Sequence, residues 1–104
     1  MPEMRISEMM ITFYCAAADR EIVAEALRAV TREPIHLRDE EVLGRDFGDA
    51  RPAEQVRGAL RRSAIELIAT GGDVDALVDA VDRSRRAHPV RWQTVAIARR
   101  GRIA

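Results

Sequence analysis

The chain has 104 residues with 17 acidic side chains and 17 basic ones, and every basic residue is an arginine. This length predicts one domain with a modest core, and the lack of lysine excludes a Walker-type phosphate loop and Schiff-base chemistry. One cysteine excludes an intramolecular disulfide, and no apolar run is long enough to cross a membrane. We expect a cytoplasmic protein without membrane insertion.

The first half of the domain predicts a strand and a helix. Residues 1–8 form a flexible lead-in, and residues 9–15 alternate as a strand with apolar bulk on both faces. Asp19 is suited to cap a helix. The helix then presents apolar residues at helical spacing up to Pro34, which ends it: Ile22, Val23, Ala26, Leu27 and Val30.

Residues 35–43 predict a weaker strand whose acidic run, 39–41, suits the exposed edge of a sheet. Glycine, aspartate and proline then predict a long loop at about 44–59. Residues 60–69 fit a helical and an alternating apolar pattern about equally well. Periodicity alone leaves this segment open between helix and strand.

The last part of the chain predicts a second helix and a final strand. Gly71 and Gly72 break the chain, Asp73 is a candidate cap, and a helical stripe follows: Val74, Leu77, Val78 and Val81. Pro89 precedes a strand at 90–97. Charge is uneven, because residues 1–60 hold 12 acids and 8 arginines whereas residues 61–104 hold 5 acids and 9 arginines. The arginines after Asp82 either decorate a solvated helix end and terminus or form an anion site, and without an aromatic platform we expect no nucleic-acid partner.

If 60–69 is a strand, the order of elements predicts an α+β, ferredoxin-like βαββαβ sandwich, with a four-stranded antiparallel sheet and two helices on one face. The other face would then be open and would carry Tyr14 together with either Trp92 or Val95. Soluble monomers rarely expose large apolar patches. We therefore expect a homo-oligomer that buries the open face.

Several short segments together resemble an uncharacterised family of PII-like domains: Pro52 to Gly58 (PAEQVRG), Arg61-Arg62, Asp73 to Leu77 (DVDAL), Trp92, and Gly101-Arg102-Ile103. That family is similar in fold to PII signalling proteins and CutA, and its genes often accompany heavy-metal efflux systems. The resemblance covers residues 9–104. It implies a strand at 60–69, the long PII loop at 44–59, and a trimer with ligand clefts between subunits. PII proteins hold phosphates partly with a lysine, which this chain lacks.

Catalysis is not expected, because the chain has no HExxH, CxxC or GxSxG motif and no cofactor is implied. Cys15 on a strand is best explained as a small buried hydrophobe. One chain supplies too few ligands for a transition metal, so no metal site is predicted. The alternative is a CutA-like metal-binding protein linked to heavy-metal tolerance, in which His36 or His88 of three chains converge on an axis.

The function expected from the residues and the resemblance is that of a PII-like trimeric signalling protein. It would bind a small anionic ligand, such as a nucleotide, in clefts between subunits, or dock through its loop on a partner such as a membrane transporter. Arginine suits the first role, since its planar fork binds phosphate or carboxylate bidentately. The candidate ligand-binding residues are Gln55, Arg57, Gly58, Arg99, Arg100 and Arg102. The candidate docking residues in the loop are Asp46, Phe47, Asp49 and Glu54.

Overall fold

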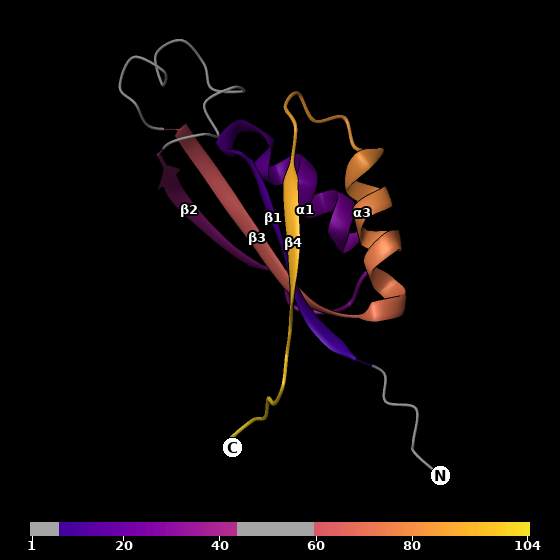
Figure 1. Ribbon diagram of the computed structural model, residues 1–104. Coiled ribbons are helices and arrows are strands. Elements are labelled where there is room, and N and C mark those ends of the chain that lie inside the picture. The colour runs from indigo at the N-terminus through magenta and orange to yellow at the C-terminus, as the bar shows by residue number, and fades with distance from the viewer. Residues whose placement is uncertain (1–6, 44–59) are drawn as a thin grey trace.

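The computed structural model describes residues 7–43 and 60–104 of the chain. The strands are β1 (Glu8–Ala16), β2 (His36–Val42), β3 (Leu60–Thr70) and β4 (Arg91–Ala96), and the helices are α1 (Arg20–Arg28) and α3 (Val74–Asp82). The strands form one antiparallel sheet in the order β2-β3-β1-β4. Both helices cover the same face of this sheet (Figure 1). The predicted ferredoxin-like βαββαβ fold is therefore confirmed.

The segment that periodicity left open is a strand, as the resemblance implied. β3 pairs with β1 on one side and with β2 on the other, so it lies in the interior of the sheet. Most side chains of β3 are buried or half-buried on both faces, so its sequence shows no strict alternation of polar and apolar residues. This explains why Leu60 to Ala69 fitted two patterns at once.

The core lies between the sheet and the two helices. Ile11, Phe13 and Cys15 of β1 all point toward the helices and are almost fully buried. They pack with side chains from β3 and from both helices: Val23, Leu27, Ile65, Leu67, Leu77 and Val81. Burying one large aliphatic or aromatic side chain contributes about 1.5–3 kcal/mol, so this single layer accounts for most of the apolar stabilisation of the sandwich.

Because both helices lie on one face of the sheet, its other face is not covered by helices (Figure 1). Cross-strand partners share a face, so Trp92, which is opposite Phe13, lies on the helix side. Val95 is opposite Met10 and lies on the open face, where its side chain is exposed. Of the two candidates for the open face, Val95 is therefore the one that lies there.

The two aspartates predicted to cap the helices stand at the helix starts but do not cap them. Asp19 and Asp73 precede α1 and α3, yet neither side chain caps its helix. Asp19 instead accepts the backbone N–H groups of Ala87 and His88, at 3.0 and 2.9 Å, and so fixes the linker between α3 and β4. The first helix also ends at Arg28, earlier than Pro34 suggested.

Candidate functional site

Three of the four arginines predicted to bind a ligand, Arg99, Arg100 and Arg102, follow β4 in a tail segment, residues 97–104, that leaves the body of the molecule (Figure 1). The root of this tail is attached to β1. Ile97 donates its backbone N–H to the carbonyl of Glu8 at 3.1 Å. Arg100 also binds the carboxylate of Glu8 with two nitrogens, at 3.1 and 2.7 Å. These hydrogen bonds lower the pKa of Glu8 below its ordinary value and raise that of Arg100.

Arg99 and Arg102 differ from Arg100 because each is exposed and neither has a hydrogen bond or ion pair within the described part of the chain. The tail therefore presents two uncommitted guanidinium groups next to one that holds it in place. The remaining ligand candidates, Gln55, Arg57 and Gly58, lie outside the described residues. So do the docking candidates of the loop: Asp46, Phe47, Asp49 and Glu54. Whether these residues meet the tail stays a prediction.

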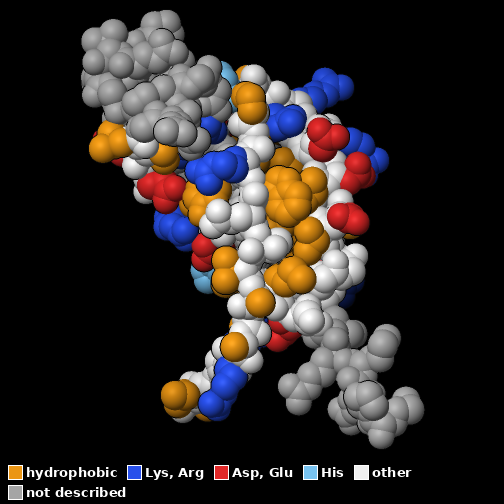
Figure 2. Space-filling view, in the orientation of Figure 1, with side chains coloured by type: hydrophobic (Ala, Val, Ile, Leu, Met, Phe, Trp, Pro, Cys, Tyr) orange, Lys and Arg blue, Asp and Glu red, His pale blue; other side chains and the backbone are white. Residues whose placement is uncertain are grey.

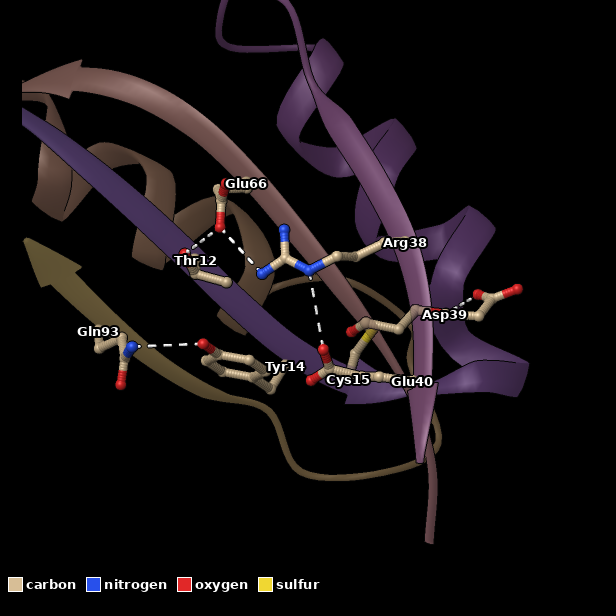
Figure 3. Close-up of polar contacts among 9 residues, drawn as sticks. Thr12, Tyr14, Cys15, Arg38, Asp39, Glu40, Glu66 and Gln93 are labelled. Atoms are coloured by element: carbon tan, nitrogen blue, oxygen red, sulfur yellow. Dashed lines mark hydrogen bonds and ion pairs between the residues drawn. The ribbon is translucent and has the colours of Figure 1, made fainter. Parts of the chain in front are cut away.

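A polar network that the sequence did not reveal crosses the open sheet face (Figure 3). Its centre is Glu66 of β3, whose Oε2 atom accepts from Thr12 Oγ1 at 3.0 Å and from Arg38 Nη2 at 3.1 Å. Arg38 Nε also lies 3.7 Å from Oε2 of Glu40. Arg38 is the main cause of the lowered pKa of Glu66, whereas Glu66 raises that of Arg38. The network joins β1, β2 and β3.

The same face carries a second group of contacts around Tyr14. The guanidinium carbon of Arg91 lies 4.4 Å from the centre of the Tyr14 ring, a cation–π distance. Gln93 donates from Nε2 to the Tyr14 hydroxyl oxygen at 3.2 Å (Figure 3). Tyr14 is thereby covered by polar side chains of β4.

The expectation of an apolar open face therefore needs correction. Met10, Ile68 and Val95 form one apolar group at neighbouring positions in the register, while the polar network around Glu66 occupies the centre of the face. Arg38 is opposite Ala64, so it reaches Glu66 as a diagonal neighbour. Only knowledge of the strand register could have revealed this pair, because the two residues belong to different segments of the chain.

Metal-ligating side chains are not gathered in the described part of one chain. No group of three or more histidine, cysteine, aspartate or glutamate residues there has the geometry to hold a metal ion. His36 begins β2 on the open face, opposite Glu66, whereas His88 lies in the linker before β4 and donates its backbone N–H to Asp19.

Cys15 is buried in the core, as predicted from its place on a strand. Burial, with a further contribution from nearby Asp19, raises the pKa of its thiol to about 11. The thiolate is the nucleophilic form. Cys15 therefore lacks the character of a nucleophile at neutral pH.

Two hollows in the surface of the described residues were compared with the arginine-rich lining that an anion site needs, and in both of them acidic side chains outnumber arginines. One, of about 290 Å³, includes Glu8, Arg32, Glu33 and Asp73 in its lining. The other, of about 280 Å³, lies between α3 and β4 and has Asp75, Asp79 and Asp82 along its border. Excess acid disfavours an anion in either hollow. In the residues described, no helix has the length and apolar character needed to span a membrane.

Comparison with known proteins supplies the family. Residues 7–104 match the family described as "Protein of unknown function (DUF3240)". The chain belongs to the DUF3240 family. No curated protein matches this DUF3240 chain. The predicted resemblance to an uncharacterised PII-like family is confirmed by this match together with the solved structures of similar fold.

Three solved structures illustrate the fold of the DUF3240 chain. A DUF3240 family protein from Shewanella baltica is 14% identical, with a TM-score of 0.74 over 97% of this chain and 100% of that one. Bacillus subtilis GlnK in complex with ATP is 12% identical, with a TM-score of 0.61 over 89% and 85% of the two chains. A putative PII-like signalling protein from Thermus thermophilus is 10% identical, with a TM-score of 0.56 over 88% and 90%. At these identities the likeness concerns the fold.

Proposed function

We propose that this DUF3240 chain is a non-catalytic PII-like regulatory protein that forms a homotrimer and binds a small anionic ligand between subunits. The observation that carries the proposal is the pair of exposed guanidinium groups on the tail, Arg99 and Arg102, which have no partner among the described residues. Each can form charge-assisted, bidentate hydrogen bonds with phosphate or carboxylate. The tail projects from the body, so a ligand on these arginines gains its remaining contacts from a second subunit.

The chemistry of the single chain supports placing the site between subunits. Among the charged residues that line the hollows of about 290 and 280 Å³, acids outnumber arginines, so neither hollow supplies a favourable environment for an anion. A guanidinium in open water binds an anion weakly, because water competes and salt screens the charge. A neighbouring subunit that covers Arg99 and Arg102 would exclude water and strengthen both contacts.

The open sheet face supports assembly in a second way. Met10, Ile68 and Val95 form an apolar area that a neighbouring copy would remove from water. The adjoining polar residues already satisfy one another, since Thr12 and Arg38 both donate to Glu66. Burying a polar network whose members are already hydrogen-bonded costs less than burying unpaired groups. The mixed face is therefore compatible with an intersubunit contact.

The regulatory output in this proposal is docking of the loop on a partner such as a membrane transporter. The loop residues concerned, Asp46, Phe47, Asp49 and Glu54, lie outside the described residues, so the support here is the position of the segment between β2 and β3. Ligand binding at the tail would then alter which partner the loop engages. The protein acts in the cytoplasm in this proposal.

Light scattering and calorimetry test the proposal. We expect a mass of three chains at micromolar concentration, against 11.6 kDa for one chain. ATP is the first anion to titrate because GlnK, one of the similar structures, contains it. Replacing Arg99 and Arg102 by alanine should weaken binding by about tenfold or more, since a hydrogen bond to a charged group is worth about 1.5–3 kcal/mol.

A matched control is Arg28→Ala, which removes an exposed arginine paired only with Glu25 on α1 and should leave the affinity unchanged. A monomer would overturn the proposal. So would equal affinity in the tail variant and the wild type, or no heat with ATP, a cyclic nucleotide and bicarbonate in turn. If copper or zinc binds instead, and binding is lost on replacing His36 or His88, the CutA-like alternative is the correct one.

A further inference from the structure

An apolar groove runs between α3 and the outer edge of β4, away from the open sheet face. Its floor is formed by Phe13, Val78, Val81, Val90 and Trp92, and its volume is about 280 Å³. Trp92 is 43% exposed, which leaves a large aromatic surface facing water. Figure 2 shows the hydrophobic side chains gathered beside β4, with acidic side chains along their outer border. The charged residues that line the groove are Asp75, Asp79 and Asp82 of α3, together with Arg86.

The backbone along this groove is a free sheet edge. β4 is the last strand in the sheet order, and within the described ranges it pairs only with β1. The hydrogen bond from Ile97 to Glu8 sets the alternation of the ladder. It follows that Trp92, Thr94 and Ala96 direct their backbone N–H and C=O groups away from β1. Such an edge is a ready template for another extended segment.

The tail has the properties that this groove requires. Residues 97–104 read IARRGRIA, so the segment is basic and carries an isoleucine near each end. Ile103 is 99% exposed, and Arg102 beside it has no partner among the residues described. Across the groove, Asp75 likewise has no hydrogen bond or ion pair in the described part of the chain. Asp79 and Asp82 already pair with Arg83 and Arg86, so Asp75 is the acid left for the basic tail, and Ile103 suits the apolar lining of the groove.

The tail does not contact the groove of its own chain. The tail continues from the end of β4 and is held beside β1 by the two hydrogen bonds from Arg100 to Glu8. It therefore leads away from the groove and toward solvent (Figure 1).

We propose that the groove between α3 and β4 binds the tail of a second copy of this chain. Residues 101–104 lie along the outer edge of β4, and Ile103 covers Trp92 and Val78. Because the tail of one copy binds a different surface on the next, the contact is heterologous, and it forms a ring when the rotation between copies closes, as the proposed homotrimer requires. The inference rests on the homotrimer of the proposed function, and it names the segment that links its subunits.

Cysteine cross-linking between two populations of chains tests this contact. Chains carrying Ile103→Cys are mixed with longer, tagged chains carrying Val78→Cys, exchanged at low concentration, reassembled and oxidised mildly. Native Cys15 is buried and has a pKa raised to about 11, so it does not compete. We expect a mixed disulfide between the two kinds of chain. The control partner is Ile22→Cys, on an exposed part of α1, which should give none.

A charge reversal gives a second, independent measurement. Asp75→Arg places a positive charge beside the groove, so it should repel the basic tail and raise the concentration at which the oligomer dissociates by about tenfold, as measured by light scattering on dilution. Glu21→Arg makes the same change of charge on α1 and should leave that concentration unchanged. Circular dichroism shows that both variants are folded before they are compared.

The outcomes separate this inference from the proposed function. An intact oligomer that still binds ATP, but forms no mixed disulfide with Val78→Cys, would overturn the tail contact and leave the ligand site standing. Equal cross-linking to Val78→Cys and Ile22→Cys would also overturn it. A monomer in light scattering would overturn both proposals together.

Discussion

The carboxylate of Asp19 provides the most direct test of how the chain holds its shape. Asp19 is 2% exposed, and its two oxygens accept separate backbone N–H groups, from Ala87 at 3.0 Å and from His88 at 2.9 Å. These bonds join residues 68 and 69 positions apart in the chain. They hold the linker that carries Val90 and Trp92 to the groove.

Replacing Asp19 by asparagine keeps the size of the side chain and one acceptor oxygen, but its amide group then faces the second N–H. A hydrogen bond to a charged group contributes about 1.5–3 kcal/mol, and an unsatisfied buried N–H costs about 1–3 kcal/mol. The two figures describe the same lost hydrogen bond and so are not summed. We therefore expect the free energy of unfolding to fall by about 2–3 kcal/mol. For a domain of this size that corresponds to a decrease in Tm of roughly 10–15 °C.

Urea denaturation followed by circular dichroism measures the loss, at one protein concentration because oligomers gain stability by mass action. Asp73→Asn is the matched control, since Asp73 also precedes a helix without capping it but is exposed and accepts only from Thr70. It should cost no more than about 0.5 kcal/mol. If Asp19→Asn lies within 0.5 kcal/mol of wild type, or if Asp73→Asn costs as much, the role assigned to the Asp19 carboxylate is wrong.

Two further predictions follow from the altered pKa values. Cys15, with its pKa raised to about 11, should resist alkylation by iodoacetamide at pH 8 in the folded protein and react fully in urea, and rapid reaction of the native protein would contradict its burial. The pKa of Glu8 in the folded protein is lower than the ordinary value of 4.5. The contact with Arg100 is therefore fully present above the pKa of the unfolded chain, and it is lost as pH falls through the lower pKa of the folded protein. NMR should show the tail released in that acid range, whereas in Glu8→Gln the tail signals should be independent of pH there.

Much of the architecture followed from local pattern. The helical spacing of Val74, Leu77 and Val81 placed α3, and alternation in β1 correctly assigned Ile11, Phe13 and Cys15 to one face. These inferences succeed because an amphipathic element records in its own sequence which side it buries. The edge position of β2 was also predictable, since its acidic run discourages further pairing.

The sequence by itself thus determined the elements on either side of the loop and β3, the apolar faces that form the core, and the family resemblance. It left Leu60 to Thr70 open, because an interior strand satisfies helical and alternating patterns together. Only the tertiary structure decided the contacts that depend on register or on distant parts of the chain. These include the pairing of Arg38 with Glu66, the use of Asp19 by the linker, and the side of the sheet on which Trp92 lies. Each joins groups more than 25 residues apart, and no local periodicity carries that information.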